Sequence, residues 1–285
     1  MASTEQTMVC YRHPGTETAV ACSNCGRPIC TDCMVFAAVG IKCPECAGQP
    51  AGVKKATTRA RVAAGSGTTG IVTKVLIGLN VGVFLLQASQ GDLSGIRSDV
   101  FENGALARPF LADGEWWRLA TTGFLHIGPI HLLFNMLMLW WFGTPLENLL
   151  GRARFLAVYG VSVLAGSAGA LLLAPDTLTV GASAGVFGIL GAGLVLERKG
   201  IAVFGGAALV VVVLNLALTI VLRNNISLGG HVGGLVGGAL VILALTQFGR
   251  VHAAYGRVGA VGIVGVVAVA IASVAIAYAR VRGYA

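Results

Sequence analysis

From Ile71 onward, long apolar stretches alternate with short polar turns, and this pattern constrains the fold more than any other feature. A helix needs about 20 largely apolar residues to cross the hydrocarbon core of a bilayer. Hydrophobic residues make up 55% of the chain and charged residues only 11%, which favours a membrane protein over a soluble one. The sequence therefore predicts an all-α polytopic membrane protein, with seven spans near Ile71–Gln87, Ile130–Leu146, Phe155–Leu173, Ala182–Leu196, Ile201–Leu222, Leu228–Phe248 and Val258–Ala279.

The positions of the basic residues predict the orientation of these spans. Cations precede the first span and recur in alternate loops, and such loops lie on the cytoplasmic side of a membrane. The opposite loops carry some arginines too, so the bias is moderate. We expect a multi-pass protein of the cell membrane with a cytoplasmic amino terminus, and no cleavable signal peptide, because the terminus is polar and rich in cysteine. The formal charge of +8 is interpreted as attraction to the bilayer surface, with no nucleic-acid partner.

The amino-terminal part of the chain has a different composition. Residues 1–50 contain all seven cysteines and no long apolar run. Residues 51–70 are mostly small or basic, as in a linker. The sequence therefore predicts a small cytoplasmic domain at 1–50, a linker at 51–70 and a membrane domain at 71–285.

The cysteines of the first domain form pairs with a two-residue gap, which is the spacing of zinc ligands. Eight ligands suffice for two tetrahedral zinc ions. A disulfide framework is less consistent with an odd number of cysteines and a cytoplasmic location. The pairs are Cys10 with His13, Cys22 with Cys25, Cys30 with Cys33, and Cys43 with Cys46.

Spacing alone leaves open how the four pairs share two ions. In an interleaved arrangement the first and third pairs hold one ion and the second and fourth hold the other, which resembles cross-braced, B-box-like fingers. A sequential arrangement is the alternative. Four protein ligands leave no open position on zinc, so both ions are expected to be structural rather than catalytic. We expect this domain to bind a cytoplasmic protein partner or to regulate, rather than to react.

Two glycine-rich runs at the starts of predicted spans carry one serine and one histidine. Ser183 lies in the run 181–185 (GASAG), and His231 lies in the run 229–234 (GGHVGG). A serine hydroxyl is a weak nucleophile without an adjacent base, and a histidine in hydrocarbon is usually partnered and functional. Small residues four apart let two helices approach closely, which would bring the two side chains together. Because no Asp or Glu follows Glu197, a Ser183–His231 dyad is expected rather than a triad.

A second polar pair lies on the span that begins near Ile130. His131 and Asn135 are four residues apart and therefore share one helical face. Their imidazole and amide groups could donate hydrogen bonds to a developing oxyanion, and one such donor contributes about 3–4 kcal/mol in a transition state. The alternative interpretation is an interhelical hydrogen bond that stabilises the bundle. His126 is expected on another face, as a loop or supporting residue.

Together these motifs resemble the rhomboid family of intramembrane serine proteases. The resemblance covers nearly all of Ile71–Ala279. It implies a six-helix catalytic core with one additional carboxyl-terminal helix, and substrates that are single transmembrane helices. It also implies that Ser183 is the nucleophile, His231 the base, and His131 and Asn135 the oxyanion donors. The motifs are Glu115-Trp116-Trp117-Arg118, His131-x3-Asn135, Gly143-x2-Leu146-Glu147-x3-Gly151-x2-Arg154-Phe155, Gly181-x-Ser183 and His231-x2-Gly234-x3-Gly238.

Two residues near the expected dyad depart from the family pattern. Phe187 lies one helical turn after Ser183, where many members carry a tyrosine stacked on the histidine, so the ring is kept and the hydroxyl is lost. Gly230 replaces a frequent alanine. The zinc-binding domain lies outside the resemblance.

The sequence thus predicts a serine endopeptidase that cleaves membrane-anchored proteins within the bilayer and needs no cofactor for catalysis. A non-catalytic rhomboid-like protein that binds transmembrane helices is the first alternative, and the intact Ser183, His231 and Asn135 disfavour it. A transporter is the second, and the lack of acidic residues inside the spans disfavours ion coupling.

Overall fold

The computed structural model describes residues 8–36, 40–47, 70–222, 226–247 and 259–282. The chain divides into two compact units, Met1–Arg61 and Val62–Ala285, and each is described by itself. The linker predicted at 51–70 lies, apart from Gly70, outside the described residues.

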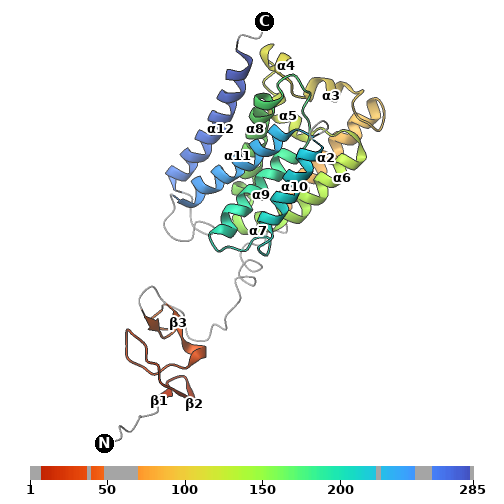
Figure 1. Cartoon of the computed structure of the whole chain (residues 1–285). Helices are drawn as coiled ribbons and strands as arrows, with labels where there is room; N and C mark the ends of the chain where they lie inside the picture. Colours follow the sequence, from red (N-terminus) through yellow and green to blue (C-terminus); the bar gives the residue numbers. More distant parts are fainter. Residues whose placement is uncertain (1–7, 37–39, 48–69, 223–225, 248–258, 283–285) are drawn as a thin grey trace, which may run out of the picture. The chain divides into compact units, whose positions relative to one another are not determined.

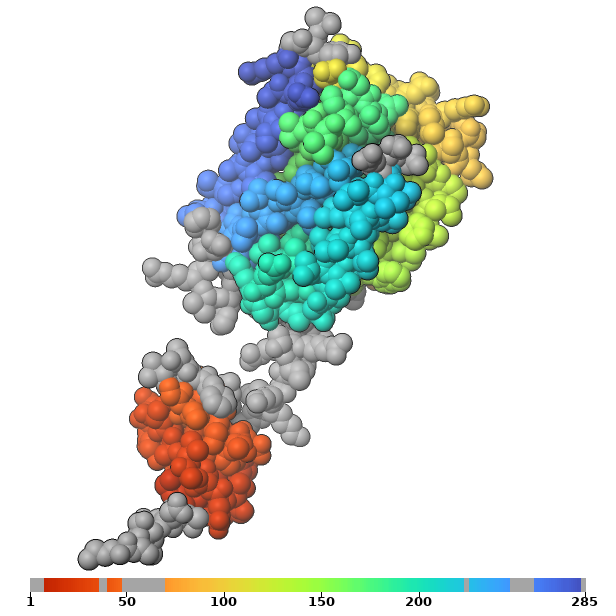
Figure 2. Space-filling model, viewed as in Figure 1, coloured from red at the N-terminus to blue at the C-terminus, as the bar shows by residue number. Residues whose placement is uncertain are grey.

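The amino-terminal unit, red to orange in Figures 1 and 2, contains short strands. Its buried core is made mainly of cysteines. Strands β1 (Met8–Cys10) and β2 (His13–Thr18) form an antiparallel hairpin, and β3 (Val35–Phe36) pairs with β4 (Ile41–Lys42). A short 3-10 helix, η1, covers Thr31–Cys33. Ile29 is the one fully buried aliphatic side chain among the described residues of this unit. So small an apolar core stabilises a fold weakly, and domains of this size usually rely on metals or disulfides.

The second unit is a helical bundle, as the apolar stretches predict (Figure 1). A helix corresponds to each of the seven expected spans. The helices are α2 (Ile71–Gln90), the continuous run α6 (Gly128–Met138), η3 (Leu139–Gly143, a π-helix) and α7 (Thr144–Leu150), then α8 (Arg152–Leu173), α9 (Ser183–Arg198), α10 (Ala208–Val221), α11 (Leu228–Gln247) and α12 (Ala260–Val281).

The helices differ in whether they are long enough to cross a bilayer alone. In the described part of the chain, α2, α8, α11 and α12 are long and apolar enough. A fifth span results if the segment Arg118–Phe124 and the run from α6 to α7, which meet at an angle of 93°, count as one. Helix α9 has 16 residues, which agrees with the predicted span Ala182–Leu196, whereas α10 has 14 and is shorter than the predicted span Ile201–Leu222. Helix α9 is short because Gly181, with φ of 125°, precedes its first turn and Gly200, with φ of 81°, follows its last.

The centre of the bundle is formed by α8, α9 and α11, which pack side by side (Figure 1). Glycines on α11 allow this approach, because a Cβ at Gly229 would collide with the backbone of Gly169 on α8, and a Cβ at Gly238 with the backbone of Gly188 on α9. At Gly230, by contrast, a Cβ would meet only the side chain of Ser227. The glycines of α11 therefore allow close packing against two helices, α8 and α9.

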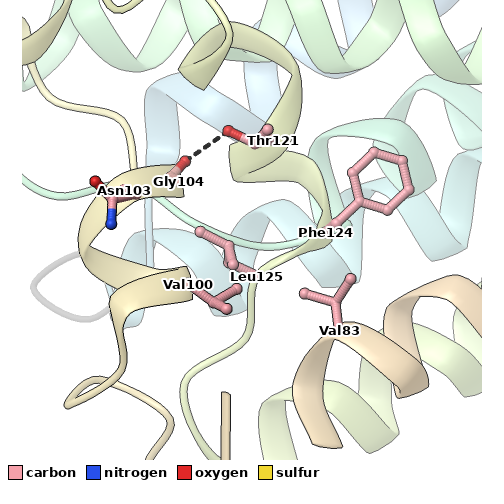
Figure 3. Close-up of a pocket in the computed structure, with 7 residues that line it drawn as sticks. All are labelled: Val83, Val100, Asn103, Gly104, Thr121, Phe124 and Leu125. Carbon is pink, nitrogen blue, oxygen red and sulfur yellow. Dashed lines mark hydrogen bonds between the residues drawn. The ribbon is translucent and has the colours of Figure 1, made fainter. Parts of the chain in front are cut away.

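The long segment before α6 folds into short helices. These are α3 (Asp99–Gly104), α4 (Arg108–Ala112), α5 (Arg118–Thr121) and the 3-10 helix η2 (Thr122–Phe124). Arg118 is buried beneath them and donates to the carbonyl oxygens of Glu102 at 2.6 Å and Ala105 at 2.7 Å, while also pairing with Glu115. A cavity of about 280 Å³ lies beside α3 and η2. Figure 3 shows the residues that line it, most of which are apolar.

A buried carboxylate fixes the start of the bundle. Glu147 on α7 accepts hydrogen bonds from the backbone N–H groups of Val72 at 3.0 Å and Thr73 at 2.8 Å, and from the Thr73 hydroxyl at 2.8 Å. These N–H groups lie in the first turn of α2, where intrahelical partners are missing. Glu147 therefore stabilises α2 at its positive end, which gives this residue of the motif at 143–155 a structural role.

Candidate active site

Ser183 is the first residue of α9, directly after a tight turn. Gly181 has φ of 125°, a conformation that residues with side chains rarely adopt. The turn is also crowded, since a Cβ at Gly181 would lie 2.9 Å from His131 Cε1, 3.0 Å from His131 Nε2 and 3.6 Å from Ser183 Oγ. Glycine at 181 therefore lets the serine start a helix while the imidazole of His131 lies against the same backbone.

His231 lies in the first turn of α11 and meets Ser183 directly. Its Nε2 atom is 2.9 Å from Ser183 Oγ, and its side chain is buried. Phe187 stacks on the imidazole, with ring centroids 4.0 Å apart and planes at 20°. The ring contact expected at this position is thus made without a hydroxyl. The structure brings together the two residues that the sequence singled out.

The other imidazole nitrogen has a partner that the sequence did not indicate. His231 Nδ1 is 2.7 Å from the hydroxyl oxygen of Thr219 on α10. The same hydroxyl donates to the backbone carbonyl of Asn215 at 2.7 Å. Both imidazole nitrogens of His231 are therefore hydrogen-bonded.

His131 and Asn135 lie on α6, which covers the start of the span predicted near Ile130, and their side chains make different hydrogen bonds. The backbone N–H of Ile127 points to His131 Nδ1 at 3.4 Å, which leaves Nε2 as the nitrogen that carries hydrogen, next to Gly181. The Asn135 amide donates to the carbonyl of His131 at 2.9 Å, within its own helix. One amide hydrogen of Asn135 stays available for another acceptor.

His126 precedes α6 and is fully buried against His131. The two rings meet edge to face at 5.1 Å, and neither nitrogen of His126 has a partner among the described residues. Gln87 holds its backbone, donating to the His126 carbonyl and accepting from its N–H, each at 3.2 Å. This placement agrees with the supporting role expected for His126, since it packs against His131 and does not reach Ser183 by any hydrogen bond.

Comparison with known proteins relates this geometry to a family. The Rhomboid domain model matches residues 113–248. YdcA of Bacillus subtilis (strain 168) is 38% identical over 141 residues, which cover 48% of this chain and 71% of that protein. The chain belongs to the rhomboid family. It is therefore an integral, multi-pass membrane protein with a mostly helical fold.

Two further relatives show how much of each protein is shared with this rhomboid. The Rhomboid protease GluP of Bacillus subtilis (strain 168) is 36% identical over 177 residues, covering 61% of this chain and 34% of GluP. RHOMBOID-like protein 5 of Arabidopsis thaliana is 35% identical over 164 residues, covering 53% of this chain and 52% of that protein. The chain thus spans only about a third of GluP and about half of the plant protein.

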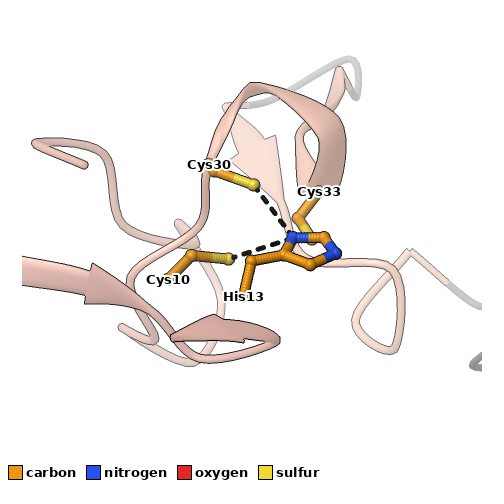
Figure 4. A group of neighbouring side chains, drawn as sticks. All are labelled: Cys10, His13, Cys30 and Cys33. Atoms are coloured by element: carbon orange, nitrogen blue, oxygen red, sulfur yellow. Dashed lines mark hydrogen bonds between the residues drawn. The ribbon is translucent and has the colours of Figure 1, made fainter. Parts of the chain in front are cut away.

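The amino-terminal unit of this rhomboid lies outside the matched domain and contains two groups of potential metal ligands. Figure 4 shows the first group, whose four side chains point toward one another. Both groups are interleaved along the chain rather than sequential, which decides between the two arrangements that spacing left open. They are Cys10, His13, Cys30 and Cys33, and Cys22, Cys25, Cys43 and Cys46.

Distances between these ligand atoms fit a tetrahedral ion. Zinc–ligand bonds of about 2.3 Å to sulfur and 2.0 Å to nitrogen place tetrahedral ligand atoms roughly 3.5–3.8 Å apart. His13 Nδ1 lies 3.2 Å from Cys30 Sγ, 3.4 Å from Cys33 Sγ and 3.9 Å from Cys10 Sγ. In the second group, the sulfurs of Cys25 and Cys43 are 3.7 Å apart. All seven cysteines are free thiols, so either group could bind a metal.

Hydrogen bonds and burial shift the pKa values of the thiols in opposite directions. Burial acts to raise the pKa of Cys10, but hydrogen bonds, including backbone ones at Cys30 and Arg12, outweigh it and lower the pKa to about 6. Burial, together with the neighbouring sulfurs of Cys10 and Cys30, raises the pKa of Cys33 to about 12. The protonation of one thiol in a group therefore affects the pKa of its neighbours.

Proposed function

We propose that this rhomboid is an intramembrane serine endopeptidase that cleaves transmembrane-anchored proteins through a Ser183–His231 dyad. The observation that carries the proposal is the 2.9 Å contact between Ser183 Oγ and His231 Nε2. That distance lies within the range of about 2.6–3.2 Å in which a base can accept a proton from its nucleophile. Relatives named as rhomboid proteases support the same assignment.

The chemistry follows the acyl-enzyme route. Ser183 Oγ attacks the carbonyl carbon of the scissile peptide as its proton passes to His231 Nε2. The tetrahedral intermediate collapses when the imidazolium protonates the leaving nitrogen, so the C–N bond breaks and an acyl-serine ester forms. His231 then takes a proton from water, which attacks the ester, and the proton returns to Ser183.

Oxyanion stabilisation would come from groups around Gly181. The Nε2–H of His131 lies next to Gly181, and the backbone N–H of Ser183 is in the first turn of α9, where helix N–H groups lack partners. The positive end of the α9 dipole favours negative charge at the same place. Asn135 would contribute its second amide hydrogen. Removing one such donor typically lowers the rate by about 10²–10³.

We infer two further properties from the loops and the amino-terminal unit. Cationic loops support a cytoplasmic amino terminus. Each interleaved group would hold one structural zinc ion through four protein ligands, which leaves no open position for reaction chemistry. The amino-terminal unit would then serve to recruit a cytoplasmic protein partner or to regulate, while the membrane unit binds single transmembrane helices as substrates.

The test is cleavage of a model transmembrane substrate by the purified full-length chain in liposomes, with the cut mapped by mass spectrometry. Wild-type protein should cut a defined bond, and Ser183→Ala should not. Ser273→Ala is a matched control, because it removes a buried hydroxyl whose hydrogen bond goes to the Val269 carbonyl on α12. That control should cut at the wild-type rate. Substrate binding without cleavage by wild-type protein would instead favour a helix-binding function.

A further inference from the structure

The hydroxyl of Thr219 lies between two atoms that both approach within hydrogen-bonding distance. It is 2.7 Å from His231 Nδ1 and 2.7 Å from the carbonyl oxygen of Asn215. Thr219 is almost completely buried, with 1% of its surface exposed. Its contacts are therefore set by the protein rather than by solvent.

Counting hydrogens assigns a direction to each contact. A threonine hydroxyl has one hydrogen to donate, and a carbonyl oxygen has none. If the hydroxyl donated to His231, its oxygen and the Asn215 carbonyl oxygen would face each other at 2.7 Å without a hydrogen between them. Both contacts are hydrogen bonds only if the hydroxyl donates to the carbonyl and accepts from Nδ1–H. Donation to the carbonyl four residues earlier is also a common choice of threonine in helices.

This direction fixes the state of the base. A neutral imidazole carries hydrogen on one nitrogen, so a hydrogen on Nδ1 leaves a lone pair on Nε2. That lone pair faces Ser183 Oγ at 2.9 Å. When His231 becomes an imidazolium, its Nδ1–H still has an acceptor, and the hydrogen bond becomes stronger because the donor is charged.

Carboxylates perform this task in serine proteases that have a triad, but within the described residues no carboxylate is hydrogen-bonded to His231. The sequence has no Asp or Glu after Glu197. Within the described residues, the ring of His231 is contacted by Ser183, Phe187 and Thr219, and Phe187 offers no polar atom. A neutral hydroxyl therefore takes the place of the acid.

We propose that Thr219 is a positioning residue that holds His231 in the Nδ1–H tautomer and orients its Nε2 atom toward Ser183. This inference rests on the proposed protease function, and it concerns a residue on α10, outside the motifs that carry the family resemblance. Thr219 reaches the reaction only through the imidazole of His231.

Substitutions at Thr219 separate the hydroxyl from the shape of the side chain. Thr219→Val keeps the branched shape and removes the hydroxyl, and it should lower kcat about 10- to 100-fold with KM unchanged. Thr219→Ser keeps the hydroxyl and should retain kcat within about threefold of wild type. Thr246→Val is the matched control, because Thr246 donates the same bond to a carbonyl four residues earlier, Ile242 at 2.7 Å, and accepts from Lys199 Nζ at 2.7 Å rather than from a histidine. Its kcat should equal the wild-type value.

Nitrogen NMR of 15N-histidine-labelled protein provides a measurement that does not depend on cleavage. The His231 signals are assigned by their loss in His231→Gln, and wild type should show a protonated Nδ1 and an unprotonated Nε2. Thr219→Val should lose this preference, and Thr219→Ser should keep it. A wild-type tautomer with hydrogen on Nε2, or a Thr219→Val protein with wild-type kcat and tautomer, would overturn the proposal. If wild type has the expected tautomer but cleaves nothing, the protease function fails while the role of Thr219 in fixing the tautomer stands.

Discussion

Gly234→Ala should disrupt catalysis although Gly234 has no side chain to take part in the reaction. A Cβ at Gly234 would lie 2.2 Å from the carbonyl oxygen of Ala184, the residue after Ser183, and 2.8 Å from its carbonyl carbon. Non-bonded heavy atoms pack no closer than roughly 3.2 Å, so α9 and α11 must separate by roughly 1 Å. The side of α11 that faces α8 gives no room, because Gly229 and Gly233 lie against the backbone of α8.

Separating α9 from α11 lengthens the distance between Ser183 and His231 by about the same amount. Adding roughly 1 Å to the observed 2.9 Å gives about 3.9 Å, which is too long for a hydrogen bond. A displacement of this size in a catalytic group lowers rates by about 100-fold. Overpacking should also reduce the free energy of unfolding by roughly 1–3 kcal/mol.

Gly230→Ala is the matched control for this substitution. It adds the same methyl group four residues earlier on α11, but the new Cβ would meet only the Ser227 side chain, 3.1 Å away, which can move. Both proteins are assayed for kcat on a transmembrane substrate and for thermal unfolding in detergent. Gly230→Ala should resemble wild type in both. A Gly234→Ala protein with wild-type kcat and stability would refute the reasoning that close helix packing sets the dyad.

Three further predictions test the site and the metal groups. Ser183→Ala, His231→Ala and the double variant should lose cleavage to a similar residual rate, and additive losses in kcat would show that the two residues do not act as a unit. Asn135→Ala should keep a weak activity, about 10²–10³ below wild type, since nucleophile and base remain; an unchanged kcat would remove Asn135 from the oxyanion site. Elemental analysis should find two zinc ions per chain, and protein starting near Gly65 should lose the zinc but keep cleaving; far less than two, or disulfides among the cysteines, would defeat the zinc assignment.

The sequence predicted the helical membrane fold because hydrocarbon imposes a simple requirement on composition and length. It was less accurate for α10, which is shorter than the predicted span Ile201–Leu222. Apolar composition reflects whether a segment faces lipid or the protein core, whereas helix length depends on local turns such as the one at Gly205 and Gly206, which precedes α10. Those turns depend on backbone conformations that hydropathy does not encode.

The sequence indicated those site residues whose burial in hydrocarbon costs free energy unless they have a partner or a function. It did not indicate the others. A histidine in a glycine-rich apolar run indicated His231. The four-residue spacing of two polar residues on one apolar span indicated His131 and Asn135. Thr219 gave no comparable signal, since a threonine in a membrane helix can satisfy its hydroxyl on its own backbone. Its contact with His231 depends on the packing of α10 against the dyad.

The sequence alone did not show which pairs of metal ligands share an ion. A two-residue gap fixes which ligands form a pair, because the pair is local. Which pairs share an ion depends on how the two hairpins cross, and several crossings satisfy the same spacing. The structure places Cys10 with Cys30 and Cys22 with Cys43, which the spacing allowed but did not require.

Covalent labelling with a fluorophosphonate tests the central claim most directly, because this reagent modifies a serine only when an adjacent base activates it. Full-length protein in detergent is incubated with the reagent, digested and mapped by mass spectrometry. An activated dyad should give one modification, at Ser183, in wild-type protein and in Ser273→Ala. Ser183→Ala should not be labelled, and labelling of His231→Ala should be at least about 100-fold slower. Absence of labelling in folded wild-type protein, or equal labelling of His231→Ala, would contradict an activated Ser183–His231 dyad.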